Sequence, residues 1–155
     1  HGLNVGDEIE VTAPTGNFFL LNTNKKNVFI SGGVGLTPMI AMLNQLVEAG
    51  VPQAVSFIHA CRNEKVHAMK QHIDNVRAQF ANVNTFVVYE EGQADATGYL
   101  DLANVPADML DPDADYYLCG PMVFMQKQYQ DLLARGIAAE QIHSEAFGTG
   151  GLALA

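Results

Sequence analysis

The chain has 155 residues, 48% of them hydrophobic, and its formal net charge at pH 7 is −9. This length and apolar content predict one main globular domain with a sizeable core and exclude a disordered chain. The acidic charge argues against a nucleic-acid-binding surface and against binding to an anionic membrane surface.

Neither cysteine belongs to a metal-ligand or disulfide pattern, so Cys61 and Cys119 are expected to be reduced thiols in a cytoplasmic protein. No apolar run has the length of a membrane span and no signal peptide is visible. The chain starts at His1 rather than Met, which suggests a piece of a longer protein. The scattered histidines predict no metal site and are expected to be structural or exposed: His59, His67, His72 and His143.

The first 24 residues predict a β tail. Val5, Ile9 and Val11 are apolar residues in a polar setting, and the neighbouring Gly6-Asp7 and Pro14-Thr15-Gly16 are turn signals. A polar, lysine-bearing stretch follows and fits a linker. We therefore divide the chain into a β tail at 1–24 and an α/β domain at 25–155.

From residue 25 onward, strands alternate with helices. Apolar runs predict strands at 28–30, 54–60, 85–89, 115–119 and 142–147. Helical periodicity predicts helices at 37–49, 66–80 and 122–134, whereas 90–97 is expected to be a polar loop, followed by a short strand or extended arm at 98–105 and a brief helix near 107–110. This alternation predicts a parallel sheet of about five strands with helices on both faces. Ligands of such sheets bind beyond the carboxyl ends of the strands, where the strand order reverses.

A glycine turn between the first strand and the first helix is the main candidate site. It comprises Gly32, Gly33, Val34, Gly35, Leu36, Thr37 and Pro38. Its glycines allow backbone N–H groups to approach a phosphate, and the helix N-terminus adds partial positive charge. The dinucleotide fingerprint is imperfect because Pro38 replaces its third glycine, so a purely structural turn remains an alternative. The lysine of a phosphate-transfer loop is missing.

A second strand–turn–helix junction contains Cys119, Gly120, Pro121 and Met122. Gly120 permits close approach of a flat ring, and Pro121 suits a helix start. Cys119 is alternatively a small buried hydrophobe. A nucleophilic role is disfavoured because no base lies beside it in the sequence.

Two further stretches belong to the same predicted rim. Glu145, Ala146, Phe147 and Gly148 close the last strand, where an aromatic ring suits stacking on a flat cofactor and a carboxylate suits tuning it. The alternative is a core phenylalanine and a solvated glutamate. Arg62 follows the second strand, where it is able to hold a 2′-phosphate or simply be solvated. NADH and NADPH therefore both remain open.

Together, Gly32–Pro38, Cys119–Pro121 and Glu145–Gly148 resemble the nicotinamide-binding domain of the ferredoxin–NADP reductase superfamily. The resemblance implies that the first motif holds the pyrophosphate and that the second lies near the nicotinamide. It also implies that Phe147 stacks on a flavin, within a cofactor-binding stretch that runs on to Thr149. Residues 1–24 resemble the last strands of the FAD-binding barrel, although its Arg-x-Tyr-Ser/Thr motif is absent from this chain.

Within that superfamily the chain resembles the flavohaemoglobins, which are bacterial nitric oxide dioxygenases. The grounds are Gly32–Met39, His59–Asn63 with His67-Ala68, Tyr117–Pro121 with Phe124–Gln126, and Ile142–Gly148. The family position before the phenylalanine is often Cys and is Ala146 here, and Glu145 matches a glutamate that influences flavin and haem potentials.

The resemblance implies that NAD(P)H reduces FAD and that electrons pass to a haem in an upstream globin domain, where oxygen and nitric oxide give nitrate. The piece alone is expected to be inactive in that reaction. The alternatives are a reductase component that feeds an iron–sulfur partner of an oxygenase, and a non-catalytic nucleotide-sensing module.

Overall fold

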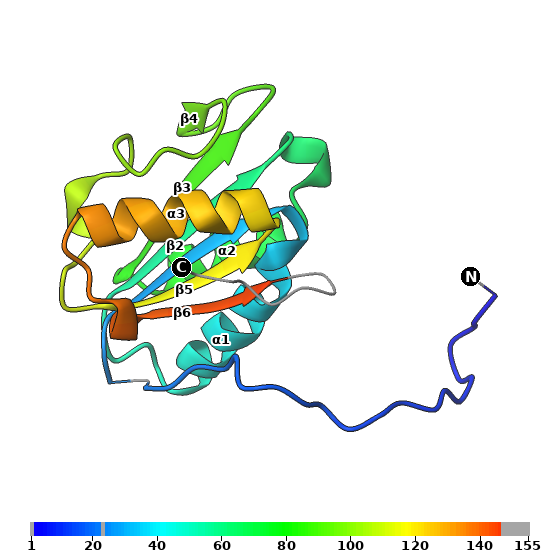
Figure 1. The fold of residues 1–155 in the computed structure, drawn as a ribbon. Helices are drawn as coiled ribbons and strands as arrows, with labels where there is room; N and C mark the ends of the chain where they lie inside the picture. The colour runs from blue at the N-terminus through cyan, green and yellow to red at the C-terminus, as the bar shows by residue number, and fades with distance from the viewer. Residues whose placement is uncertain (1, 23, 147–155) are drawn as a thin grey trace.

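Six parallel strands form a single sheet in the computed structural model, which describes residues 2–22 and 24–146 (Figure 1). The strands are β1 (Asn27–Gly32), β2 (Val55–Cys61), β3 (Val83–Tyr89), β4 (Ala96–Thr97), β5 (Asp115–Gly120) and β6 (Ile142–Ala146). Their order across the sheet is β4-β3-β2-β1-β5-β6, and every neighbouring pair is parallel. The predicted fold class is confirmed.

The prediction of about five strands is corrected to six by β4, which lies within the segment expected to be a loop. Its two residues pair with Val88 and Tyr89 of β3. The Asp95 side chain accepts a hydrogen bond from the Val87 N–H at 2.8 Å, and the Asp95 N–H donates to the Val87 carbonyl. A polar side chain thus holds this short edge strand, which hydrophobic periodicity does not reveal.

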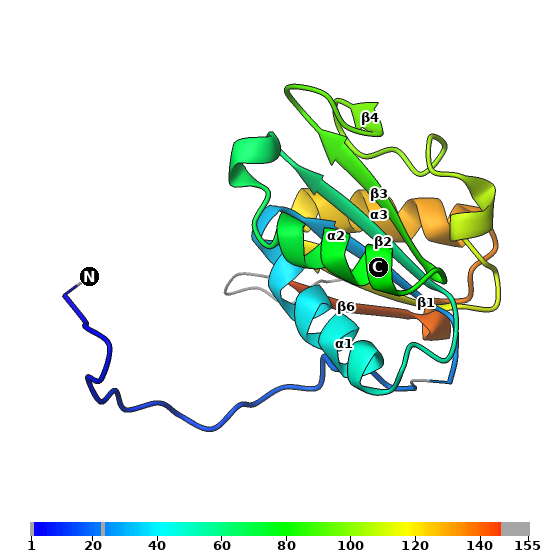
Figure 2. The same cartoon turned by 180° about the vertical axis from the view of Figure 1, so that it is seen from behind.

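Helices cover both faces of the sheet, as predicted. The α-helices are α1 (Leu36–Glu48), α2 (Lys70–Gln79) and α3 (Met122–Ala134), and the 3-10 turns are η1 (Gly33–Gly35), η2 (Glu64–Val66), η3 (Ala107–Met109) and η4 (Ala139–Gln141). Helix α3 lies on one face in Figure 1, and α1 and α2 lie on the opposite face in Figure 2.

Alternate strand residues supply two separate cores. Phe29, Phe57 and Tyr117 pack toward α1 and α2, whereas Ile30 and Leu118 pack on the α3 side. All residues of β1 and β5 are buried because both faces of these central strands are covered. This double burial explains their nearly continuous apolar runs.

The helix expected over 66–80 begins later than predicted. Val66 ends the separate turn η2, and Met69 has the left-handed φ of 58° immediately before α2. A left-handed residue interrupts a right-handed helix, so Val66 and Met69 are 57% and 52% exposed rather than part of the apolar face. Ile73 and Val76 are buried, as the periodicity predicts.

The β strands expected in the first 24 residues are not found within 2–22, where the chain is an extended, exposed arm (Figure 1). A strand needs a hydrogen-bonded neighbour, and the described sheet offers this segment none. The arm joins the body near Leu20, which is buried, and the Leu21 N–H donates to the Tyr117 hydroxyl at 3.0 Å.

The strand order reverses between β1 and β5, so the predicted switch point lies there. Register places the ends of the central strands together, with Gly32 beside Ala60, Ser31 beside Cys119 and Gly120 beside Ala146. The expected convergence of these motifs on one rim is therefore confirmed for the described residues. None of the helices within 2–22 and 24–146 is long and apolar enough to cross a membrane.

Candidate functional site

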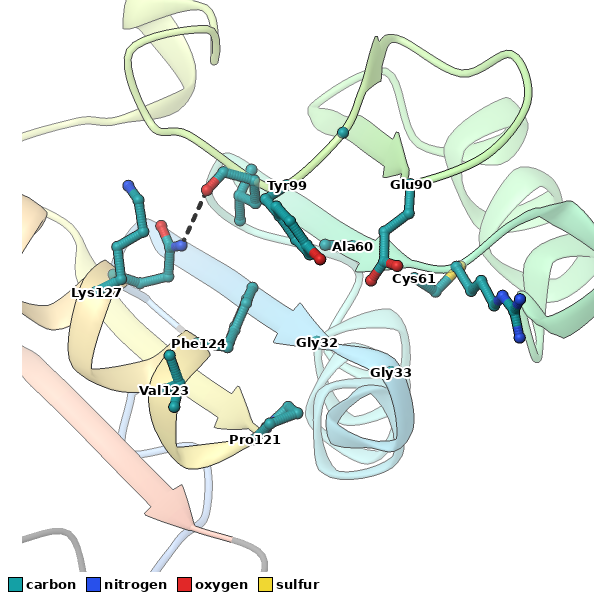
Figure 3. A pocket seen from close by; sticks show the side chains of 14 residues that line it. Gly32, Gly33, Ala60, Cys61, Glu90, Tyr99, Pro121, Val123, Phe124 and Lys127 are labelled. Atoms are coloured by element: carbon teal, nitrogen blue, oxygen red, sulfur yellow. Dashed lines mark hydrogen bonds between the residues drawn. The ribbon is translucent and has the colours of Figure 1, made fainter.

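A cavity of about 570 Å³ lies at the carboxyl edge of the sheet, on the side covered by α3 (Figure 3). Its walls come from the two glycine turns, the ends of β2 and β3, the segment after β4 and the first half of α3. The lining residues are Gly32, Gly33, Ala60, Cys61, Arg62, Glu90, Gly98, Tyr99, Leu100, Pro121, Val123, Phe124, Lys127 and Gln128.

The turn from Gly32 to Gly35 presents backbone donors at the edge of this cavity. Gly33 has the left-handed φ of 53°, which favours glycine, and no side chain caps η1 or α1. The first N–H groups of a helix have no intrahelical partners, and the first turn of α1 contains no acidic residue. The arrangement suits an anionic group such as a phosphate.

The predicted members of this turn have different surroundings. Gly32 and Gly33 line the cavity, whereas Val34 is 65% exposed outside it. The Thr37 hydroxyl donates to the Val34 carbonyl at 3.2 Å and so braces the turn. Leu36 is buried, and Pro38 is half-buried in the first turn of α1. Direct ligand contacts by these residues remain predictions.

Gly35 is needed for packing between the two turns. A β-carbon placed on Gly35 would lie 2.1 Å from the Cys119 carbonyl oxygen and 2.7 Å from the Gly120 nitrogen. Such distances are sterically impossible without backbone movement, so only glycine fits. The glycine turn therefore rests directly on the end of β5.

Phe124 is the flat ring that lies against Gly120. A β-carbon on Gly120 would lie 2.9 Å from Phe124 Cδ1, and one on Gly32 would lie 3.1 Å from the same atom. Both glycines therefore leave room for one half-buried ring, which forms a wall of the cavity. Pro121 lines the cavity beside it, and Met122 begins α3 just outside.

Cys119 is completely buried, and its thiol does not line the cavity. Burial, followed by the neighbouring charge of Glu145, raises the pKa of the Cys119 thiol to about 12. The group is therefore a neutral thiol at physiological pH, in agreement with the expectation that it is no nucleophile. Only the backbone of Cys119 is therefore a candidate for contact with a cofactor, and this contact remains a prediction.

Charged groups stand at the mouth of the cavity, beyond β2 and β3. Glu90 reaches toward the cavity in Figure 3, and its N–H donates to the Cys61 carbonyl. Arg62 lines the same edge, where its guanidinium lies 3.4 Å from Glu91 Oε1. Both partners are more than half exposed, so this ion pair is weak and Arg62 is free to reorient.

Most residues of the apolar wall lie outside the motifs that the sequence analysis assigned to the site. Tyr99 follows β4 and points its ring toward the cavity, across from Phe124 (Figure 3). The buried Gln128 side chain donates to the Leu100 carbonyl at 3.2 Å and ties this segment to α3. The lining residues that the sequence analysis did not assign to the site are Glu90, Gly98, Tyr99, Leu100, Val123, Phe124, Lys127 and Gln128. Of these, only Phe124 had a signal in the sequence, because it belongs to the stretch Phe124–Gln126 that carries the family resemblance.

The last predicted motif is only partly described. Glu145 is exposed near the end of β6, and its Oε1 faces the arm 3.9 Å from the β-carbon position of Gly16. Ala146 is the final residue of β6. Phe147, Gly148 and Thr149 lie outside the described residues. The roles of all these residues remain predictions.

Residues 29–130 match the oxidoreductase NAD-binding domain family. The flavohemoproteins of Bordetella pertussis and Rhizobium meliloti are 44% and 39% identical over 97% and 94% of this chain. The chain spans only 40% and 38% of their lengths.

Solved structures agree with these relatives. The flavohem-like FAD/NAD-binding domain of nitric oxide dioxygenase from Vibrio cholerae superposes with a TM-score of 0.80 at 37% identity, covering 88% of this chain and 56% of that one. Flavohemoglobin from Malassezia yamatoensis, with bound FAD and heme, gives a TM-score of 0.75 at 24% identity, covers 84% of this chain and 33% of that one, and so supports the fold. The predicted resemblance to flavohaemoglobins is confirmed.

Proposed function

The chain belongs to the family of oxidoreductase NAD-binding domains, and on that premise we propose that its cavity binds NAD(P)H and presents the nicotinamide to FAD. The observation that carries this proposal is the mostly apolar cavity that lies beside the glycine turn at the carboxyl ends of β1, β2 and β3, next to the strand-order switch point. Open dinucleotide-binding sheets place their ligand at this crevice.

The described walls fit the parts of a dinucleotide. The backbone N–H groups of Gly33–Gly35, a turn that no side chain caps, suit the pyrophosphate, and the rings of Tyr99 and Phe124 suit a flat base. Glu90 suits the hydroxyls of a ribose because a carboxylate accepts hydrogen bonds. We place the nicotinamide beyond Gly120 and Pro121, toward the end of β6.

The exposed arm is the part of the structure that favours an adjoining flavin domain. Leu3, Ile9 and Val11 are 63–75% exposed, although they are apolar. We propose that residues 1–24 complete the FAD-binding barrel and that 25–155 form the NAD(P)H-binding domain. FAD supplies the acceptor for hydride when it is bound, and Glu145 and Phe147 are proposed to contact it or tune it.

Hydride transfer to a flavin needs orientation and a dry contact more than it needs an acid or a base. The chain's own residues meet that requirement by holding the phosphates at the glycine turn and excluding water with the α3 wall. The neutral, buried Cys119 thiol contributes no competing nucleophile.

The complete protein is proposed to be a flavohaemoprotein of the cytoplasm. Bound FAD and a haem in an upstream globin domain would supply the electron transfer by which oxygen converts nitric oxide to nitrate. The support is the similarity to flavohemoproteins, of whose length this chain spans about 40%. The partners are then its own FAD and globin domains, NAD(P)H, oxygen and nitric oxide.

The proposal is tested by NADH-dependent nitric oxide consumption in the full-length protein. Gly32→Val should abolish consumption because its side chain presses on Phe124 and fills the cradle. Leu133→Ala, at the opposite end of α3, is the matched control and should retain activity. If NADH does not reduce the flavin of the wild-type protein, the reductase role is contradicted. If the wild-type flavin is reduced but nitric oxide is not consumed, only the proposed haem reaction is contradicted.

A further inference from the structure

A row of polar side chains lies under the carboxyl edge of the sheet, on the face covered by α1 and α2. Ser31 and His59 are direct partners in the β1–β2 register, and each follows an apolar residue, Phe29 or Phe57, on that face. Tyr89 ends β3, and His67 enters from the connection between η2 and α2. The row therefore joins three strand ends and one loop.

Each member of the row contacts the next one in space. Ser31 Oγ lies 2.8 Å from His59 Nδ1, and the His59 and His67 ring centroids are 4.6 Å apart. His67 Nδ1 lies 2.9 Å from the Tyr89 hydroxyl. Ser31, His59, His67 and Tyr89 are all buried, at 0%, 1%, 8% and 3% exposure. The two hydrogen-bonded pairs, Ser31–His59 and His67–Tyr89, fix these side chains in direction more strictly than apolar contacts would.

Both imidazoles are neutral in this setting. Burial, followed by the charge of His67, lowers the pKa of His59 to about 3, and burial also lowers the pKa of His67. His67 Nε2 is buried and has no hydrogen-bond partner among the described residues, whereas a charged imidazolium needs an acceptor at each nitrogen. Two neutral rings are thus able to lie against each other, tilted by 41°, without charge repulsion.

Each member of the row adjoins a wall of the coenzyme cavity. Ser31 immediately precedes Gly32, His59 lies three residues before Arg62, and Tyr89 immediately precedes Glu90. His67 anchors the loop that begins with Arg62, and the next residue but one, Met69, adopts an unfavourable left-handed conformation at the start of α2. The chain thus accepts local strain next to the residue that turns inward.

We propose that Ser31, His59, His67 and Tyr89 form a positioning network. It fixes the positions of the carboxyl ends of β1, β2 and β3 relative to one another, and therefore the positions of the cavity residues that follow them. This inference rests on the proposed NAD(P)H site. None of the four side chains contacts the cavity, so they act through Gly32, Arg62 and Glu90. The network is therefore a determinant of coenzyme affinity rather than of the hydride step.

The test is anaerobic stopped-flow reduction of the flavin in the full-length protein at a series of NADH concentrations. This experiment yields the Kd for NADH and the limiting rate separately. His59→Phe keeps an aromatic ring at this position but removes the nitrogen that faces Ser31. It should raise the Kd for NADH at least about fivefold, as expected for one lost buried hydrogen bond. The limiting rate should be unchanged.

Conservative and remote variants separate positioning from packing. His59→Asn places an amide group near the Nδ1 position and should restore a Kd close to that of the wild type. Tyr89→Phe removes only a hydroxyl and should raise the Kd in the same direction, even where His59→Phe does not fold. His72→Gln alters a half-buried histidine of α2 that is paired with Asn44 and lies outside the network, and it should leave both constants unchanged.

Unchanged Kd values in the His59→Phe and Tyr89→Phe variants would overturn the network. Equal weakening by His59→Asn and His59→Phe would also overturn it, because ring packing alone would then explain the effect. If NADH fails to reduce the flavin of the wild-type protein, the proposed function is wrong, and this inference fails with it.

Discussion

Gly35 and Cys119 stand so close that a β-carbon on Gly35 would lie 2.1 Å from the Cys119 carbonyl oxygen. The contact joins the glycine turn of β1 to the turn at the end of β5 across the switch point. It gives Gly35 a role in packing that is separate from any phosphate contact.

Gly35→Ala should therefore destabilise the protein. The new methyl group meets backbone that cannot move aside, so we expect a loss of about 3 kcal/mol in the free energy of unfolding, at the upper end of overpacking costs. Urea denaturation measures the loss. Gly50→Ala is the matched control, because Gly50 has a φ of 76° but open space around it, and it should lose only about 1 kcal/mol. Equal losses in the two variants would refute the steric account.

Tyr99→Ala should weaken NADH binding without unfolding the protein. The side chain is 83% exposed, so its removal leaves the core intact. Loss of an aromatic platform for a base costs about 1–3 kcal/mol, and we therefore expect the Kd to rise at least about fivefold. Calorimetric titration with NADH measures the change. Tyr99→Phe retains the ring and should bind as the wild type does; an equal loss in both variants would argue against stacking.

Glu90 is expected to favour NADH over NADPH. Its carboxylate lines the cavity and would repel a 2′-phosphate, and the Arg62 guanidinium, which is 69% exposed and only weakly paired with Glu91, offsets that repulsion only in part. Glu90→Gln should improve binding of NADPH relative to NADH by about fivefold, since interactions between solvent-exposed charges amount to at most about 1 kcal/mol. Glu64→Gln, an exposed change outside the cavity lining, is the control. An unaltered ratio of the two Kd values in Glu90→Gln would contradict this assignment.

The buried histidine pair should make the fold sensitive to mild acid. The folded pKa of His59 lies near 3, below the ordinary value of 6.5, so the unfolded chain binds the proton more readily. Its stabilising contribution is complete above pH 6.5 and falls as pH decreases from 6.5 toward 3, by about 1.4 kcal/mol per unit for one such group. Between pH 6.5 and 5, His59→Phe should reduce the slope of unfolding free energy against pH.

The groups around His67 must be considered in that experiment. After burial, the charges of Lys70 and Asp74 of α2 and of Glu64 of η2 act on the pKa of His67. The window between pH 6.5 and 5 is the range in which an ordinary imidazole, with a pKa of about 6.5, takes up its proton. His72→Gln should keep the wild-type slope. A His59→Phe slope equal to that of the wild type would show that His59 is not the buried titrating group.

The sequence predicted the frame of this molecule well, because its signals were local. Apolar runs marked the central strands, and Pro121 marked the start of α3 within one residue. Strand–turn–helix junctions placed the two glycine turns on one rim. Periodicity failed at Val66 and Met69, where a capped turn and a left-handed residue override the apolar spacing.

The walls of the site were less predictable. Tyr99, Glu90 and Phe124 come from three segments that meet only after the sheet forms, and none of them belongs to a glycine motif. The ring of Phe124 occupies the space that Gly32 and Gly120 leave open. Sequence reasoning identified the need for a close ring at Gly120, but it assigned that space to a ligand.

The central claim, that this domain delivers hydride from NAD(P)H to a flavin, is tested most directly by a kinetic isotope effect. The full-length protein is mixed anaerobically with NADH or with NADH deuterated at the transferred C4 position, and loss of the oxidised-flavin absorbance is followed. The account predicts rapid flavin reduction that slows with the deuterated coenzyme. Flavin that stays oxidised after mixing with saturating NADH would contradict it.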